Sequence, residues 1–303
     1  MKSSLLTAMM IDDCLHDPVL GAKILMGYEC PPHMELRLWG MWNNFMMIDS
    51  SGFGTGKTLC IALVAALRSM LMEDRVSGII SRQGVQARLI TAYFDKWAKT
   101  NKILASQIVS GLGEKPRITH KEEVNQIFFK NGSVVRIQSP GLREGAERLA
   151  SEDWNDGYCD EWTRYDDIEA FWRLVVGRCR RPVNPIYDGR DSLFGNHLFL
   201  SGTATYEWMP AFKQWERIKK KMIANEVGYE AQAWNYTHIP KRYEHLIREA
   251  KKFIVEMEAN LPRAVVQQEI YGVWVKDSAS CYRREDIEGA RSAGCPILLK
   301  GVE

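Results

Sequence analysis

The sequence lacks several features that define other classes of protein. Its seven cysteines are odd in number and form no Cys-x-x-Cys pair, so we expect neither a disulfide framework nor a zinc site. No apolar run reaches the roughly 20 residues that a membrane-spanning helix needs, and the first residues do not have the pattern of a signal peptide. These absences favour a globular protein in a reducing compartment such as the cytoplasm.

Charge of one sign is also lacking, because the formal net charge is only +2. A surface that binds nucleic acid would therefore have to be local. Basic residues cluster at positions 178–181, 217–221 and 241–242. Each cluster can equally be a solvated helix face or helix end, which is the commoner role of such residues.

A glycine-rich segment carries the most specific signal in the chain. It follows an apolar run at 45–48 and precedes a helix-like apolar run at 59–67, and it reads Ser51, Gly52, Phe53, Gly54, Thr55, Gly56, Lys57, Thr58. A strand, a glycine-rich turn and a helix N-terminus together form a phosphate site, because backbone N–H groups and the helix dipole both attract an anion. We therefore predict that the segment binds ATP or GTP.

The residue types in this segment indicate the role of each. Lys57 is expected to reach the β- and γ-phosphates, Thr58 to offer its hydroxyl to Mg²⁺, and Gly54 and Gly56 to let the backbone approach the nucleotide. The segment departs from the usual pattern at Ser51, which stands where the first glycine is normally found. A glycine-rich turn that merely ends a strand is the alternative, but Gly-Lys-Thr before an apolar helix argues against it.

A second candidate site lies at the end of a short predicted strand around residues 158–159. Asp160 and Glu161 follow directly, about one hundred residues after the phosphate loop. Asp160 can hold Mg²⁺ through water or Thr58, while Glu161 can polarise an attacking water, so the pair favours hydrolysis over transfer of phosphate to a small molecule. Acidic neighbours could shift this site by a few positions, namely Glu152, Asp153 and Asp156.

A third candidate follows the predicted strand at 197–200 and reads Ser-Gly-Thr-Ala-Thr. Ser201 and Thr203 can sense the γ-phosphate, because ligands bind at the carboxyl ends of the strands in open α/β sheets. The alternative is that Ser201 or Thr205 only caps the helix expected at 206–224. In series with the two earlier motifs, the sensing role is preferred.

The rest of the chain alternates between strand and helix patterns. Strands are expected at 76–81 and 230–236, helices at about 87–97, 166–178 and 243–259, and a hairpin joins 125–130 to 133–138. This order predicts an α/β P-loop NTPase of the RecA/ASCE-like type, with a mostly parallel sheet flanked by helices and an added antiparallel hairpin. We expect one ATPase domain over 1–276, with 1–41 as a helical segment on the adenine side, and a linker or tail over 277–303.

The order of these motifs resembles the ATPase portion of the large terminase subunit of tailed bacteriophages. The resemblance rests on an N-terminal proline-containing segment, the phosphate loop, the segment Ile-Ser-Arg-Gln-Gly-Val-Gln-Ala at 80–87, arginines ahead of Asp160 and Glu161, and Ser-Gly-Thr-Ala-Thr. It covers about residues 17–275, including 234–237 and 267–272 near the close of the domain. Each motif is short, and their combination is specific.

This resemblance implies a DNA-packaging motor that uses ATP and Mg²⁺. In such a motor, a homo-oligomeric ring of subunits at the procapsid portal hydrolyses ATP and moves double-stranded DNA inward. The implied partners are double-stranded DNA, other copies of the chain, the portal protein and the small terminase subunit, with no membrane. The implied location is the cytoplasm of the host, with transient binding at the portal.

The resemblance also implies roles for single residues. Glu161 becomes the catalytic glutamate, Asp160 supports the metal, and the segment from Ser201 to Thr205 couples hydrolysis to movement. An arginine ahead of Asp160 would act on the nucleotide of a neighbouring subunit; Arg148 is nearest that position and Arg143 is second. Either arginine can instead form a surface salt bridge with a nearby glutamate.

The sequence departs from the family at two places. Many members have a basic residue within the phosphate loop where this chain has Phe53. The glutamine that contacts adenine in the family is not evident, and Glu35, which follows Pro31 and Pro32, takes its place as the candidate adenine contact.

A complete large terminase also has a C-terminal nuclease, for which the residues beyond 275 leave no room. We therefore expect an ATPase without a nuclease site, as a piece of a longer protein or one half of a split arrangement. The alternatives are a helicase-like ATPase, a small-molecule kinase and a regulatory module that binds nucleotide without hydrolysis. A helicase needs a second RecA-like domain, a kinase needs no catalytic glutamate at a strand end, and Glu161 separates hydrolysis from mere binding.

Overall fold

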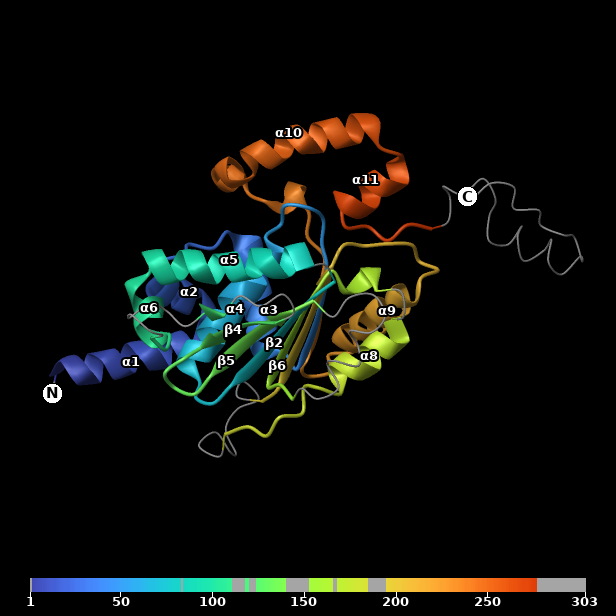
Figure 1. The fold of residues 1–303 in the computed structure, drawn as a ribbon. Coiled ribbons are helices and arrows are strands. Elements are labelled where there is room, and N and C mark those ends of the chain that lie inside the picture. Colours follow the sequence, from blue (N-terminus) through green and yellow to red (C-terminus); the bar gives the residue numbers. More distant parts are fainter. Residues whose placement is uncertain are drawn as a thin grey trace, which may run out of the picture.

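A central β-sheet of eight strands runs through the described part of the chain, in the order β3-β4-β5-β2-β6-β7-β1-β8 (Figure 1). The computed structural model describes residues 2–82, 84–110, 118–119, 124–139, 153–165, 168–184 and 195–276. The strands are β1 (Met46–Ser50), β2 (Val76–Ser81), β3 (Ile118–Thr119), β4 (Val124–Phe128), β5 (Val134–Gln138), β6 (Asp156–Asp160), β7 (His197–Gly202) and β8 (Tyr229–Gln232).

The strand pairing is that of a RecA/ASCE-like P-loop fold. Strands β5, β2, β6, β7, β1 and β8 pair in parallel, while β3, β4 and β5 pair antiparallel at one edge. Strand β7 lies between β1, which leads into the phosphate loop, and β6, which ends at Asp160. The predicted fold class is confirmed, including the antiparallel hairpin formed by β4 and β5.

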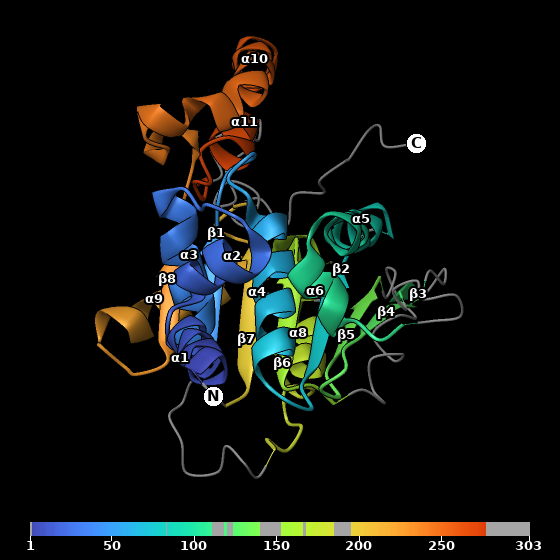
Figure 2. The same cartoon turned by 90° about the vertical axis from the view of Figure 1, so that its left-hand side faces the viewer.

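Helices cover both faces of the sheet (Figures 1 and 2). One face carries α2 (Pro18–Met26), α3 (Pro32–Asn43), α4 (Lys57–Leu71), α5 (Gly84–Thr100) and α6 (Lys102–Gln107). At the N-terminus, α1 (Lys2–His16) extends away from this layer. The other face carries α8 (Ile168–Val176) and α9 (Pro210–Ile223). Two buried apolar clusters fill the space between the sheet and these layers. None of the helices in the described residues is long and apolar enough to cross a membrane.

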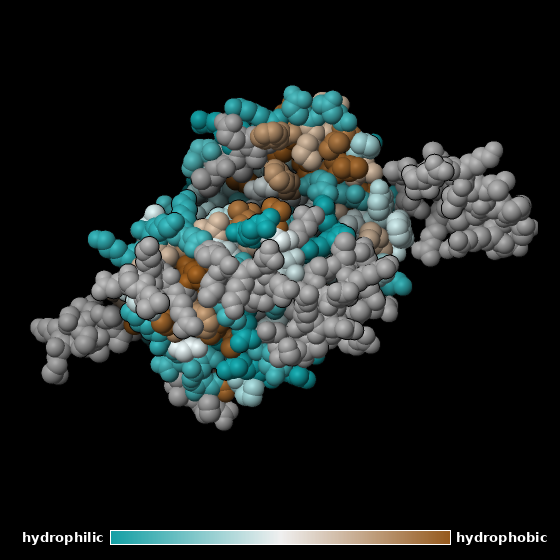
Figure 3. Space-filling model, viewed as in Figure 1, coloured by the Kyte–Doolittle hydropathy of each residue, from teal (hydrophilic) through white to brown (hydrophobic). Residues whose placement is uncertain are grey.

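The last described helices, α10 (Glu244–Asn260) and α11 (Arg263–Glu269), lie beyond the carboxyl ends of the parallel strands (Figure 1). They have a small apolar cluster of their own, which contains Ile254, Val266 and Ile270. Hydrophobic residues gather in this region on the face shown in Figure 3. The segment therefore packs as a separate helical unit beyond the edge of the sheet that is formed by the carboxyl ends of the parallel strands.

The register of the sheet brings polar residues to one level of that edge. Asp160 of β6 is paired with Ser81 of β2 on one side and with Ser201 of β7 on the other. Ser201 is in turn paired with Asp49 of β1. Because the strands are parallel, the segments that follow them leave the sheet at the same place. The three motifs identified in the sequence therefore meet at one edge.

Helix α9 begins later than the sequence pattern predicts. It starts at Pro210 with Met209 as its N-cap residue, rather than near position 206. Proline is favoured in the first turn of a helix, because its fixed φ suits the helix and its missing N–H is not needed there. Ser201 lies within β7, and neither it nor Thr205 caps α9. The capping alternative is therefore wrong.

A buried ion cluster fixes the start of β6. The carboxylate of Asp156 lies 3.1 Å from Nε of Arg68 on α4 and 2.7 Å from a terminal nitrogen of Arg75, which precedes β2. Burial opposes the charge of Asp156, but the two guanidinium groups outweigh this and hold its pKa at about 2. The charge on Asp156 therefore stabilises the fold by compensating part of the charge of two buried guanidinium groups.

We expect Asp156→Asn to lower the free energy of unfolding by about 3–5 kcal/mol, because the negative charge that lies against the Arg68 and Arg75 guanidinium groups in the interior would be lost. Denaturant unfolding at pH 7 measures this. The pKa of Asp156 is depressed in the folded state, so the contribution is complete above about pH 4 and is lost as the pH falls toward 2.

The matched control is Asp153→Asn, which removes the exposed carboxylate that accepts a 2.7 Å hydrogen bond from Arg180. We expect it to leave stability at the wild-type value, because exposed ion pairs contribute little. Equal effects of the two substitutions would contradict the role assigned to Asp156.

Candidate nucleotide site

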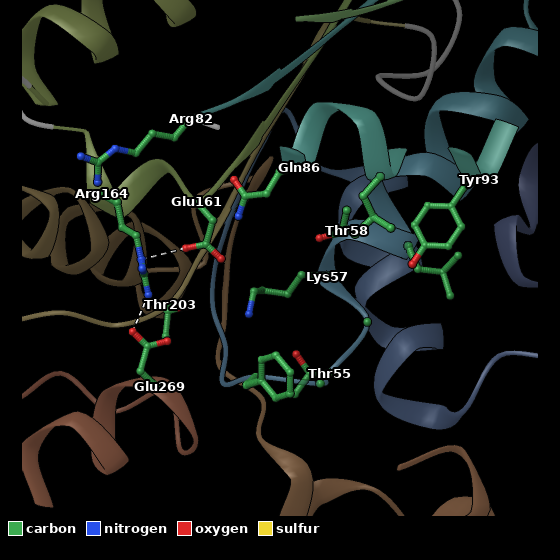
Figure 4. Close-up of a pocket in the computed structure, with 15 residues that line it drawn as sticks. Thr55, Lys57, Thr58, Arg82, Gln86, Tyr93, Glu161, Arg164, Thr203 and Glu269 are labelled. Atoms are coloured by element: carbon green, nitrogen blue, oxygen red, sulfur yellow. Dashed lines mark hydrogen bonds and ion pairs between the residues drawn. The ribbon is translucent and has the colours of Figure 1, made fainter. Parts of the chain in front are cut away.

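A cavity of about 550 Å³ opens at the carboxyl edge of the sheet (Figure 4). The phosphate loop forms its floor, and the ends of β2, β6 and β7 supply further walls. The lining residues are Phe53, Gly54, Thr55, Gly56, Lys57, Thr58, Leu59, Arg82, Gln86, Leu89, Tyr93, Glu161, Arg164, Thr203 and Glu269. The cavity thus combines most of the predicted phosphate loop with Glu161 and Thr203.

The phosphate loop has the backbone shape that its glycines permit. Gly54 and Gly56 have φ of 75° and 76°, in the left-handed region that side chains other than glycine rarely adopt. Lys57 begins α4, and its Nζ donates hydrogen bonds to the carbonyl oxygens of Ser51 (2.8 Å) and Gly52 (3.1 Å). The first N–H groups of a helix have no partner within the helix, so the start of α4 can bind an anion.

Thr58 and Asp160 form the candidate metal site. The Thr58 hydroxyl donates a 2.9 Å hydrogen bond to Oδ2 of Asp160, while Oδ1 of Asp160 is buried and has no hydrogen-bond partner among the described residues. Burial and the charge of Glu161 raise the pKa of Asp160 to about 6. The hydrogen bond from Thr58 and the charge of Lys57 lower this pKa, but by less. A hydroxyl beside a carboxylate oxygen that lacks a partner fits a Mg²⁺ ion, whose ligands are oxygens.

Glu161 leaves the sheet in an unusual backbone conformation. Its φ is 56°, and it precedes the short 3-10 helix Trp162–Arg164. Non-glycine residues in the left-handed region are uncommon and gather at functional sites. The side chain of Glu161 points into the cavity, and Arg164 lies beside it (Figure 4). The two carboxylates therefore point in different directions. That of Asp160 faces Thr58, and that of Glu161 faces the cavity.

Arg37 is a site residue that no motif in the sequence indicates. It is fully buried under the phosphate loop, where it donates hydrogen bonds to Asp49 (2.8 Å), to the carbonyl oxygen of Thr55 (2.7 Å) and to the hydroxyl of Ser51 (3.2 Å). The Ser51 hydroxyl also donates to Asp49 and accepts from the backbone N–H of Trp234. Ser51, which stands at the first glycine position, thus links the phosphate loop to Arg37, Asp49 and Trp234.

The C-terminal segment holds the other side of the loop. The N–H of Gly52 donates to the carbonyl oxygen of Trp234 at 2.7 Å, and the N–H of Phe53 donates to that of Glu269 at 2.6 Å. A Cβ atom on Gly52 would lie 1.9 Å from the carbonyl oxygen of Ile270, so only glycine fits there. Gly52 is therefore required by a close backbone contact, which no local pattern reveals.

Two of the remaining predicted residues lie close to the site without lining the cavity. Ser201 is buried in β7, and its hydroxyl has no hydrogen-bond partner among the described residues. Glu35 lies in the first turn of α3, whose Met34 and Arg37 contact the loop, and it is not one of the described residues that line the cavity. Arg143 and Arg148 lie outside the described residues. The roles of these residues stay predictions.

The far wall of the cavity contains residues for which no site role was predicted, although Arg82 and Gln86 belong to the motif at 80–87. Arg82 and Gln86 follow β2, and Leu89 and Tyr93 continue along α5. The Ser81 hydroxyl donates to Oε1 of Gln86 at 3.0 Å. These residues stand after a parallel strand next to β6, and that position is the signal that could have identified them.

Solved structures with the same fold include large terminases. The ATPase domain of the Thermus phage P74-26 large terminase matches 84% of this chain and 97% of its own length, with 12% identity and a TM-score of 0.53. The large terminase of bacteriophage HK97 matches 82% of this chain with 11% identity and a TM-score of 0.57. A third large terminase, from another thermophilic bacteriophage, matches 82% with 13% identity and a TM-score of 0.52.

This third large terminase has also been solved with ATP-gamma-S and with ADP. The present chain spans about half the length of the third large terminase and of the HK97 protein, at 54% and 51%. No protein-family model matches the sequence, and a search of curated proteins finds no match. At these identities the comparison establishes the fold, and it confirms the resemblance inferred from the motifs at that level.

We expect Gly52→Ala to lower the free energy of unfolding by about 1–3 kcal/mol and to weaken nucleotide binding, because the added Cβ would push the loop away from Ile270. Gly84→Ala is the matched control, since a Cβ at Gly84 meets no atom within 4 Å. Denaturant unfolding and titration with a fluorescent ATP analogue measure the two effects. Identical behaviour of the two variants would contradict the close contact at Gly52.

Proposed function

We propose that the chain is the ATPase motor domain of a bacteriophage large terminase, which hydrolyses ATP with Mg²⁺ to move double-stranded DNA into a procapsid. The observation that carries the proposal is the placement of Lys57, Thr58 and Glu161 around one cavity. The large-terminase fold supports it, with similar chains that cover 82–84% of this one. The order of the sequence motifs is independent support.

The residues of the cavity have distinct tasks in hydrolysis. The N–H groups at the start of α4 and the ammonium group of Lys57 bind the phosphates and compensate their charge. Thr58 and Asp160 would hold the Mg²⁺ ion, which would supply charge neutralisation for the phosphates. Glu161 orients and polarises the attacking water, since it is the carboxylate on the wall of the cavity at the end of β6.

Coupling to DNA movement is assigned to the segment from Ser201 to Thr205, which begins at the end of β7. Thr203 lines the cavity, and its carbonyl oxygen accepts a 2.8 Å hydrogen bond from the hydroxyl of Thr163, two residues after Glu161. The segment then continues to Met209 and enters α9. A change at the nucleotide can therefore reach α9 through covalently connected residues.

The partners follow from the proposed motor. They are duplex DNA, further copies of the chain in a ring, the portal protein and the small terminase subunit. A motor that moves any sequence must contact phosphates rather than bases, so DNA binding should be independent of sequence and weaken steeply with salt. Arg148, or Arg143 in second place, would act on the nucleotide of a neighbouring copy and stabilise charge in the transition state.

Two substitutions test the assignment of hydrolysis. Glu161→Gln should leave ATP affinity near the wild-type value and lower the turnover rate by about 100-fold or more, because only the polarisation of water is lost. Lys57→Ala should weaken ATP binding by about tenfold or more, because a cation beside the phosphates is lost. Equilibrium binding of ATP and release of phosphate measure the two quantities separately.

Glu216→Gln is the matched control, since this glutamate pairs with Lys219 on α9, away from the cavity. It should match the wild type in both measurements. Wild-type protein that binds ATP but gives no phosphate release above the Glu161→Gln level would favour a regulatory nucleotide-binding module instead. Turnover that survives in Glu161→Gln would remove Glu161 from the catalytic role.

A further inference from the structure

Arg164 lies between two carboxylates that come from distant parts of the chain (Figure 4). Its Nε is 3.2 Å from Oε2 of Glu161, and one of its terminal nitrogens forms an ion pair with Glu269 at the end of α11. The side chain of Arg164 is 40% exposed, against 16% for Glu161 and 32% for Glu269. One guanidinium group thus bridges the candidate catalytic carboxylate and the C-terminal helical unit.

The backbone fixes one end of this bridge. Arg164 ends the 3-10 helix that follows Glu161, and its N–H donates to the Glu161 carbonyl oxygen at 3.1 Å. Trp162 within this turn is fully buried, and the Thr163 hydroxyl is bonded to the segment after β7. The turn cannot shift without disturbing buried groups, so Arg164 is held three positions from Glu161 on an anchored element.

The other end of the bridge is tied to the phosphate loop. The side chain of Glu269 pairs with Arg164, while its main-chain carbonyl oxygen accepts the hydrogen bond from the Phe53 N–H. A displacement of α11 would therefore act on the phosphate loop and on Arg164 at the same time.

We propose that Arg164 is a positioning residue: it holds the Glu161 carboxylate by pairing with Glu269, and so makes the placement of Glu161 depend on the position of α11. The proposal rests on the proposed ATPase function for its catalytic part, whereas the bridge itself exists in the protein without nucleotide. A guanidinium group suits this task, because its planar set of N–H donors can bind two carboxylates in a fixed geometry.

The first test concerns the protein without nucleotide. Arg164→Ala should raise amide hydrogen exchange in α11 and at Phe53 by about tenfold, because the side-chain link to α11 is lost. Glu269→Gln should give the same change, although it retains the main-chain bond to Phe53. Arg180→Ala, which removes an exposed arginine paired with Asp153, should change neither region. Wild-type exchange in Arg164→Ala would overturn the bridge.

The second test concerns catalysis. Arg164→Ala should lower the turnover rate by up to about 100-fold while the dissociation constant of ATP stays within about twofold, since misplacement of a catalytic group affects the chemical step. Glu269→Gln should lower turnover in the same way, and the double variant should be no worse than the worse single one. Arg164→Lys should turn over faster than Arg164→Ala but more slowly than the wild type, because lysine keeps the positive charge but lacks the planar set of N–H donors.

Three outcomes of this test are distinguishable. Additive losses in the double variant would overturn the proposal, because the two residues would then act independently. Weaker ATP binding at an unchanged turnover rate would also overturn it, by making Arg164 a binding residue. Phosphate release that is absent in the wild type and in every variant would overturn the ATPase function together with the catalytic part, while the hydrogen exchange still decides whether the bridge exists.

Discussion

The phosphate loop depends on a guanidinium group buried beneath it. Arg37 has no exposed surface, and its charge is compensated by Asp49 of β1. An unpaired charge in the interior is strongly destabilising, so Arg37 and Asp49 must stay paired. The position of each side chain is therefore set by the other, and the groups that are hydrogen-bonded to Arg37 are held with it. Through the Ser51 hydroxyl and the Thr55 carbonyl oxygen, the same pair sets the path of the loop. The candidate nucleotide site is built on this ion pair.

Contacts from remote segments complete the loop from the opposite side. Trp234 follows β8 and Glu269 ends α11, and their carbonyl oxygens accept the N–H groups of Gly52 and Phe53. The missing side chain at Gly52 is what allows Ile270 to come so close. A loop held both by a buried charge and by backbone hydrogen bonds has little freedom, which would suit a candidate site that presents N–H groups to phosphate in a fixed arrangement.

The sequence alone predicts those parts of the site whose chemistry is local. Lys57, Thr58, Asp160 and Glu161 could be predicted because each stands in a short motif next to a strand, and parallel strands bring their carboxyl ends together. The fold class and the hairpin of β4 and β5 followed from the alternation of patterns, and the structure confirms both. The start of α9 was misplaced, because a helix-like pattern does not show where an extended segment gives way to Pro210.

The residues that were not predicted make their contacts with segments that are distant in the sequence, or they lie in segments that carry no motif. Arg37 lies in an otherwise ordinary helical segment, and only the buried partner Asp49 reveals its role. The contacts of Glu269 with Arg164 and with the Phe53 N–H depend on how α11 packs, which no local pattern specifies. Arg164 offered one signal in the sequence, since it stands three residues after Glu161, the spacing of an i,i+3 pair.

Phosphate release per subunit, measured over a wide range of protein concentration with and without duplex DNA, tests the central claim most directly. A packaging motor whose neighbouring subunits complete each other's sites should show a rate per subunit that rises with concentration and rises further with DNA. A rate that is constant over the whole range and indifferent to DNA would contradict the motor, and would indicate a self-contained ATPase.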